Sequence, residues 1–548
     1  MPTKLALASF YTLFLLFGFL AAIIFVVMYY LDIISVAVLI IATILVNVFF
    51  WLVGPYITDF MLRIFYKMRF FSKADFQQLY PNLSDSILKI ATNQRIPFPK
   101  MGIIDDDNPT AFTYGSGAFN ARIIFTKGLF RYLETEEIES VISHELGHIV
   151  HRDFIVMTIA NTVLQILYEI SEILMRRRGG RDKKGNWLAL IGFVAYVFYI
   201  IGFYVVLFLS RLREGYADEF SARVTRKPHN LSRALIKIAY GIMAKEENPQ
   251  SMRLLESTRA IGILGFRTAK EIGLVAKVTN MTPAKIARVL LYDFVNPWAK
   301  LAELSSTHPL TGKRLARLDE IAKELGQESI FNIPEILEKS PINMEKLWRD
   351  FFTGAFIYYL PSFFGWLLLP LFFSGWFLLP LFFSNYFFPE TIFSIWLILL
   401  GLSFLVRTFY RFPQKDIEKT DIFSLMSDPY ANPARGKSVE LEGRVVGKGI
   451  PGYVFSEDMM FEDKSGILYL DYQAGIPIIG NIIFAWKKVR EILGQPMKTK
   501  GWFFRSNIQN LVIDEFAYNG EHIKSYNRFW GIAIGLLIII IGIGIKIF

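Results

Sequence analysis

Long apolar runs, separated by short polar stretches, dominate the pattern of hydrophobic and polar positions along the chain. Several runs approach or exceed the roughly 20 residues with which an apolar helix crosses a bilayer. The runs predicted to form membrane helices are residues 5–31, 33–53, 154–175, 187–210, 351–383, 391–406 and 529–548. The pattern therefore predicts a mostly α-helical, multi-pass membrane protein that has the lipid bilayer as a partner.

The run at 154–175 is the least regular of these. Its polar residues are Asn161, Gln165, Glu169 and Glu172. Polar groups in a membrane helix normally face protein, so we expect one side of this helix to be covered. A basic loop at 176–184 follows, and a simple hairpin would place it outside, against the positive-inside rule. Either the run does not fully cross, or the loop is an exception to the rule.

Residues 60–153 have the mixed pattern of a soluble domain. A loop signal at 105–109 is followed by strand-like runs at 110–115 and 123–126. The first of these strands is predicted either to pair with an extended substrate or to form an ordinary hairpin.

A second soluble pattern occupies residues 438–520, where short alternating segments predict a small β-barrel of OB type. The predicted strands are 439–446, 459–461, 467–472, 498–504 and 511–516. Because a fold does not determine a function, we expect this tethered barrel to bind protein or brace the structure. Within it, residues 482–493 are apolar and basic, which is consistent with an interfacial helix or with a solvated helix inserted in the barrel.

The amino-acid composition excludes some kinds of functional site and partner. The 548 residues are 53% hydrophobic and 20% charged, and they include no cysteine. Disulfides, thiolate ligands and a cysteine nucleophile are therefore excluded. The net charge of +10 is attributed to cations beside the spans, which face anionic lipid and the cytoplasm, so no nucleic-acid partner is expected.

The candidate chemistry centres on residues 143–148, Ser-His-Glu-Leu-Gly-His. His144 and His148 are four residues apart, so both imidazoles lie on one face of a helix and can reach one metal ion. Glu145 points toward the open side, where a carboxylate can take a proton from the attacking water. The alternative is a surface helix with two solvated histidines.

A third ligand is available in residues 211–218. Glu214 and Asp218 are again four apart on one helical face. Glu214 can supply the missing carboxylate, and Asp218 can accept a hydrogen bond from the free ring nitrogen of a ligating histidine. Alone this pair would indicate a solvated basic helix, but together with the two histidines it favours a metal site.

These motifs resemble the M48 peptidases, which include HtpX-like heat-shock proteases and Ste24 CaaX prenyl proteases. The matching residues are His144, Glu145 and His148 with Asp153, then Arg211, Glu214, Ala217 and Asp218, and then Ser306, Thr307, His308 and Pro309 with Arg314 and Leu315. Thr110, Ala111 and Phe112 resemble the family's substrate edge strand, with Thr110 where the family usually has Asn. The resemblance covers about residues 1–325, and two spans before the metal helix favour the HtpX-like branch.

The resemblance implies a zincin-type, gluzincin-like α+β domain in a membrane-embedded zinc metalloendopeptidase. One Zn²⁺ per chain would be held by His144, His148 and Glu214, although the same ligands accommodate iron. His308 or Arg314 would stabilise the oxyanion, and Asp153 and Asp218 would support the ligands.

The expected substrates are misfolded or membrane proteins, as in stress-response quality control, or alternatively CaaX-type prenyl proteins. Two other classes of protein are alternatives. A non-catalytic scaffold braced by a metal would not need Glu145. A transporter should carry ionisable residues deep in several spans, and the runs at 5–31, 33–53 and 391–406 have essentially none. No pattern indicates an oligomeric state.

These predictions divide the chain into seven segments. They are two transmembrane helices (1–59), the first half of the peptidase domain (60–153), a membrane hairpin (154–210), the second half of the peptidase domain (211–350), a transmembrane pair (351–411), the OB-like domain (412–527) and a C-terminal transmembrane helix (528–548). Cations after the second span and on both sides of the 351–411 pair predict a cytoplasmic catalytic domain in a cell-membrane protein.

Overall fold

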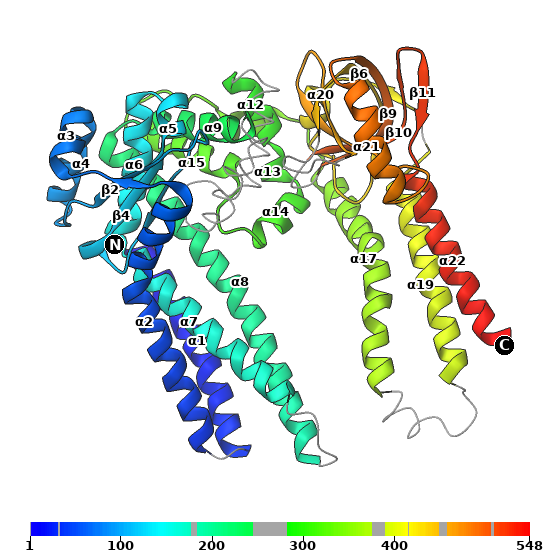
Figure 1. Ribbon diagram of the computed structural model, residues 1–548, viewed down its shortest axis with the longest axis horizontal. Coiled ribbons are helices and arrows are strands. Elements are labelled where there is room, and N and C mark those ends of the chain that lie inside the picture. Colours follow the sequence, from blue (N-terminus) through cyan, green and yellow to red (C-terminus); the bar gives the residue numbers. More distant parts are fainter. Residues whose placement is uncertain are drawn as a thin grey trace. The chain divides into compact units, whose positions relative to one another are not determined.

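The computed structural model describes residues 2–30, 33–176, 183–244, 282–374, 389–414, 416–448, 457–505 and 509–547. The chain forms two compact units (Figure 1). The first comprises residues 1–273 and 301–332, and the second comprises residues 274–300 and 333–548.

Within the described residues, six helices are long and apolar enough to cross a membrane. Their candidate spans are Thr3–Ile24, Thr43–Tyr66, Asp153–Met175, Leu190–Thr225, Phe393–Arg411 and Asn527–Ile545. They belong to α1 (Thr3–Tyr30), α2 (Ile33–Tyr66), α7 (Asp153–Arg176), α8 (Lys183–Thr225), α19 (Pro389–Arg411) and α22 (Asn527–Ile547). The prediction of a mostly helical, multi-pass membrane protein is confirmed.

Two predicted features fall partly outside the described residues. Of the predicted span at 351–383, α17 (Met344–Ser374) covers the first part, and residues 375–388 are not described. Likewise, most of the basic loop at 176–184 is not described. The helix before that loop, α7, is nevertheless long enough to cross a bilayer.

In the first unit, α1, α2, α7 and α8 pack against one another (Figure 1). Two of the polar residues of α7, Gln165 and Glu169, contact α2. The hydroxyl of Thr43 on α2 donates to Glu169 at 2.9 Å, and the Asn47 amide lies 3.2 Å from Gln165. The opposite side of α7 contributes Val163, Leu167 and Ile170 to an apolar core. Hydrogen bonds between membrane helices thus replace water as the partner of Glu169.

The first unit also holds a four-stranded sheet in the order β1-β2-β4-β3. Its strands are β1 (Arg69–Phe70), β2 (Lys100–Ile104), β3 (Ala111–Tyr114) and β4 (Arg122–Thr126). The central strands β2 and β4 are parallel, and β3 pairs antiparallel with β4 at the end of the sheet. The helices around it are α3 (Lys73–Leu79), α4 (Pro81–Asn93), α5 (Lys127–Tyr132), α6 (Thr135–Val150), α9 (Pro228–Ala244) and α15 (Thr311–Glu324), with the short η1 (Ala118–Asn120).

The second unit contains a closed five-stranded β-barrel, as predicted. Its strands are β6 (Lys437–Lys448), β7 (Met459–Glu462), β8 (Ile467–Asp471), β9 (Pro496–Phe504) and β10 (Asn510–Tyr518). They pair in the ring β6-β7-β8-β10-β9-β6, in which only β8 and β10 are parallel. The helix α21 (Ile479–Ile492) lies between β8 and β9 in sequence, and the Phe484 ring stacks 3.8 Å from that of Tyr472.

Short strands and helices complete this unit. The strands β5 (Glu418–Lys419) and β11 (Glu521–Lys524) extend the barrel. The helices are α12 (Pro283–Leu290), α13 (Tyr292–Val295), α14 (Pro297–Leu304), α16 (Ile333–Lys339) and α20 (Ile422–Met426). The last residues of α14 belong to the first unit. Below the barrel, α19 packs along α22 and also contacts α17 (Figure 1).

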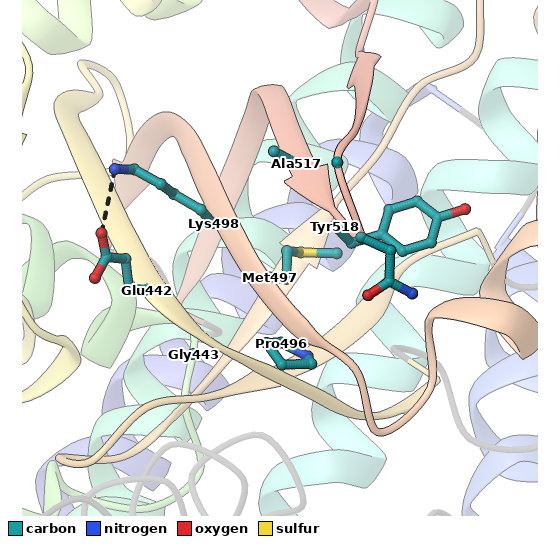
Figure 2. Close-up of a pocket in the computed structure, with 9 residues that line it drawn as sticks. Glu442, Gly443, Pro496, Met497, Lys498, Ala517 and Tyr518 are labelled. Atoms are coloured by element: carbon teal, nitrogen blue, oxygen red, sulfur yellow. Dashed lines mark ion pairs between the residues drawn. The ribbon is translucent and has the colours of Figure 1, made fainter.

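A hollow of about 330 Å³ opens on the barrel surface (Figure 2). Its lining residues are Glu442, Gly443, Pro496, Met497, Lys498, Ala517, Tyr518, Asn519 and Gly520. Lys498 and Glu442 form an ion pair at 3.2 Å on its rim. The hollow lies on the second unit, whereas the cluster of candidate metal ligands belongs to the first.

Candidate metal centre

Two helices that approach each other closely bring the candidate ligands together. His144 and His148 lie on α6, and Glu214 lies on α8. A Cβ atom at Gly147 would stand only 3.1 Å from the Cα of Ala217, so a larger residue here would crowd the crossing. The small residues let the backbones meet and place Glu214 opposite the two histidines.

The three ligand groups face one another. The Nε2 atoms of His144 and His148 lie 3.2 Å apart. Each lies 3.6 Å from a different carboxylate oxygen of Glu214. Two nitrogens bound at 2.0–2.1 Å to one tetrahedral zinc ion would be roughly 3.3 Å apart. The observed spacing therefore fits a single ion held by the three residues singled out from the sequence.

The second nitrogen of each imidazole faces a carboxylate. Nδ1 of His144 lies 2.9 Å from Oδ1 of Asp218, and Nδ1 of His148 lies 2.6 Å from Oδ2 of Asp153. An acceptor at Nδ1 favours the tautomer with its proton there. Nε2 is then the nitrogen of each ring that would bind a metal, and both Nε2 atoms face Glu214.

Two arginines hold the supporting carboxylates in place. Arg314 on α15 donates through Nε and Nη2 to the two oxygens of Asp218, each at 2.7 Å. Arg213 on α8 pairs with Asp153 and lies 3.4 Å from the hydroxyl of Ser9 on α1. The role of Arg213 was missed in the sequence, since nothing there relates it to Asp153, 60 residues earlier.

The electrostatics of the site favour a cation. Burial alone would lower the pKa of His144, but the carboxylates of Asp218 and Glu214 outweigh it and raise the pKa to about 10. The pKa of His148 is also raised, because Asp153 and Glu214 outweigh its burial. Buried carboxylates around two imidazoles thus demand positive charge, and a divalent metal ion meets the same demand.

Glu145 is buried beside this cluster, with 1% of its surface exposed. Its Oε2 accepts a hydrogen bond of 2.5 Å from the hydroxyl of Thr113 on β3. Its Oε1 has no hydrogen-bond partner in the part of the chain that the structure describes. Burial raises the pKa of this carboxyl, against the opposing effect of the two histidines. One oxygen is therefore fixed and the other is left to exchange a proton.

Of the two predicted oxyanion groups, His308 reaches the ligand cluster and Arg314 is committed to Asp218. Nε2 of His308 lies 3.6 Å from Oε2 of Glu214, and its Nδ1 lies 2.9 Å from the Thr307 hydroxyl. The segment is held against α8, because the Ser210 hydroxyl donates to the carbonyl of Thr307 at 3.0 Å.

The predicted substrate strand is an edge strand. The backbone carbonyl of Thr110 accepts from the amide of Thr126 at 3.1 Å, so the peptide groups of Thr110 point toward β4. Backbone groups of successive strand residues point to opposite edges. The peptide groups of Ala111 and Thr113 therefore face away from β4, on the side where no further strand lies among the described residues. Both residues are buried.

Comparisons with known proteins find similar sequences in one peptidase family. Residues 77–322 match the model of peptidase family M48. A protease HtpX homolog of Aeropyrum pernix is 31% identical over 295 residues, covering 50% of this chain and 83% of the relative. One from Methanothermobacter thermautotrophicus is 35% identical over 190 residues, covering 34% and 67%. Crystalline Ste24p of S. mikatae is 17% identical and aligns over 58% of this chain and 67% of its own, at a TM-score of 0.31.

The fold and the matched relatives define a membrane protease. The chain belongs to peptidase family M48, as an HtpX-like member. This confirms the resemblance seen in the motifs and supports an enzyme over the scaffold and transporter alternatives. Peptidases of this family are metalloproteases, in keeping with the cluster of His144, His148 and Glu214.

Proposed function

We propose that this chain is a zinc metalloendopeptidase and that His144, His148 and Glu214 hold its single Zn²⁺. The observation that carries the proposal is the pair of Nε2 atoms 3.2 Å apart, opposite Glu214, with both Nδ1 atoms facing carboxylates. Two histidines and one carboxylate without cysteine suit a catalytic zinc. When bound, the metal would act as a Lewis acid on the scissile carbonyl and acidify the attacking water.

The chain's own residues supply the proton transfers. Through Oε1, Glu145 takes one proton from water as the new C–O bond forms at the scissile carbonyl. Thr113 keeps the other carboxylate oxygen in place at 2.5 Å. When the C–N bond breaks, Glu145 passes the proton to the leaving amine. His308 donates to the developing oxyanion, and Arg314 acts through Asp218 on the orientation of His144.

Metal removal tests this proposal. Dialysis of the purified chain against a chelator should abolish cleavage of a destabilised membrane protein, and stoichiometric Zn²⁺ should restore it. Ferrous iron added without oxygen is the control, because the same ligands accommodate it. Undiminished cleavage by metal-free protein would contradict the proposal, and restoration by iron alone would reassign the metal.

The substrates we propose are misfolded or membrane-embedded proteins, because α8, the helix that carries Glu214, contains a candidate span. Prenylated CaaX peptides are the alternative. Parallel assays on a destabilised membrane protein and on a prenylated peptide separate the two. Cleavage of the prenylated peptide alone would assign the second class.

We also propose the finer fold classes. The barrel is of OB type, because its closed ring of five strands has one parallel pair, and its helix falls between the third and fourth strands. The peptidase domain is of zincin, gluzincin-like type, with an edge strand beside the helix that carries His144 and His148. The hydrogen bond from Thr113 to Glu145 supports this arrangement.

An extended substrate is proposed to pair antiparallel with β3 through the peptide groups of Ala111 and Thr113 that face away from β4. Only every second substrate amide then faces β3. Methylating single backbone nitrogens along a good peptide substrate should therefore raise KM with a period of two. If methylation left KM unchanged at every position, or raised it equally at every position, β3 would not bind the substrate backbone.

We propose that the catalytic domain and the barrel face the cytoplasm, on the evidence of the flanking cations. Since the chain has no cysteine, single cysteines can report sidedness at exposed Ser305 and Lys464. Two further cysteines replace Ser384 and Gly180, which lie outside the described residues. An impermeant thiol reagent applied to intact cells should label positions 384 and 180 only. Labelling of positions 305 and 464 instead would show that the catalytic domain and the barrel face the outside of the cell.

A further inference from the structure

The helix α21 carries apolar side chains on two sides. One side packs on the barrel through Phe484, Val489 and Ile492. The other side, with the turn before the helix, exposes six large apolar residues, each between 44% and 74% exposed. These residues, called the α21 surface below, are Ile476, Ile478, Ile479, Ile482, Ile483 and Trp486. A solvated helix would present polar residues there instead.

The α21 surface lies where a membrane helix begins. The amide of Tyr526 donates to the carbonyl of Gln473 at 2.8 Å, and the indole of Trp530 donates to the carbonyl of Ala474 at 3.3 Å. The amide of Ala474 in turn donates to the Asn481 side chain in the first turn of α21 at 2.8 Å. The start of α21 is thereby tied to the start of α22, the helix that carries the last candidate span (Figure 1).

Aromatic and cationic residues mark the interface at this level. Tyr526 and Trp530 flank Arg528 at the start of α22, and the Arg528 guanidinium lies 5.9 Å from the centre of the Phe409 ring on α19. Arg411 ends α19. Amphipathic aromatics and arginines are typical of the boundary between hydrocarbon and water. On α21, Lys487 and Arg490 are exposed beside the apolar residues and can meet anionic headgroups.

We propose that the α21 surface inserts into the headgroup and upper acyl region of the bilayer, beside α22. The barrel is then held against the membrane at two adjacent points, the transmembrane helix and the α21 surface, instead of turning freely on a tether. The bilayer is the occupant that the contacts favour, because this apolar surface adjoins a helix that itself enters lipid. The anchor is independent of the peptidase chemistry.

Depth measurements on the full-length chain test this anchor. Single cysteines at Ile479 and Ile483 carry an environment-sensitive nitrobenzoxadiazole label in vesicles of phosphatidylcholine and phosphatidylglycerol. Lys464, exposed in the turn between β7 and β8, is the matched control. The labels at 479 and 483 should emit at shorter wavelength and be quenched by lipids with a nitroxide just below the headgroup. The label at 464 should show neither effect.

Water-like emission at both α21 positions would overturn the proposal. A blue shift without quenching by nitroxide lipid would also overturn it, because protein, such as a second copy, would then cover this face. Equal quenching at position 464 would mean that the barrel lies on the membrane without preference for α21. Monodisperse elution of each labelled protein in size-exclusion chromatography shows that the variants remain folded, whether or not the chain cleaves peptides.

Discussion

Replacing Glu145 with glutamine is expected to abolish peptide cleavage while leaving the metal content unchanged. The carboxylate is not a ligand, and the amide keeps the size of the side chain and an oxygen for the Thr113 hydroxyl. It cannot accept the proton of the attacking water, and general-base catalysis of this kind is worth roughly 10²–10⁴-fold in rate. Metal analysis and cleavage assays on the same preparation measure both quantities.

Glu139→Gln on the same helix is the matched control, since Glu139 lies on α6 outside the ligand cluster. It should change neither metal content nor rate. Equal cleavage by wild type and Glu145→Gln would show that Glu145 is not the general base. A variant without metal would instead show that Glu145 is needed to build the site.

Replacing Glu214 with alanine should remove most of the bound metal, because it deletes one of three protein ligands. Asp218→Asn should cost less, about 10–100-fold in metal affinity or activity, since all three ligands remain and only their support changes: the acceptor at Nδ1 of His144 is weakened and the ion pair with Arg314 is lost. Metal titration with a competing chelator measures both losses. The decisive result is that Glu214→Ala loses more metal affinity than Asp218→Asn, whatever the size of each loss.

Glu219→Ala is the control on α8, because Glu219 pairs with Arg223 at 2.7 Å outside the ligand cluster. It should keep full metal affinity. If Glu214→Ala bound stoichiometric zinc and stayed active, the third ligand would have to lie elsewhere. His151 is poorly placed to act as that ligand. Its side chain is buried, and the centre of its ring lies 5.8 Å from the centre of the Phe220 ring.

The sequence predicted the features that depend on local periodicity. His144 and His148, like Glu214 and Asp218, are each four apart, so helix geometry alone placed each pair on one face. The predicted barrel strands agree with the observed ones to within two residues at each end, because alternation and turn residues are local signals.

Features that depend on tertiary contacts were not predictable in this way. The bond between Thr113 and Glu145 joins residues 32 positions apart, and the pair of Arg213 and Asp153 spans 60 positions. Neither leaves a pattern in the sequence. The two descriptions of residues 482–493 were also undecided, because periodicity shows apolar faces but not which one the barrel covers. The structure buries the face of Phe484 and leaves Ile482, Ile483 and Trp486 outside.

Zinc-edge X-ray absorption of the purified Glu145→Gln protein tests the central claim most directly, because this variant should hold metal without turning over substrate. The spectrum should fit two imidazole nitrogens at about 2.0–2.1 Å and one carboxylate oxygen at about 2.0–2.2 Å. Loss of the signal in a Glu145→Gln, Glu214→Ala double variant would assign the carboxylate. A protein that binds no stoichiometric zinc, or whose spectrum lacks imidazole, would contradict the assignment of His144, His148 and Glu214 as the metal ligands.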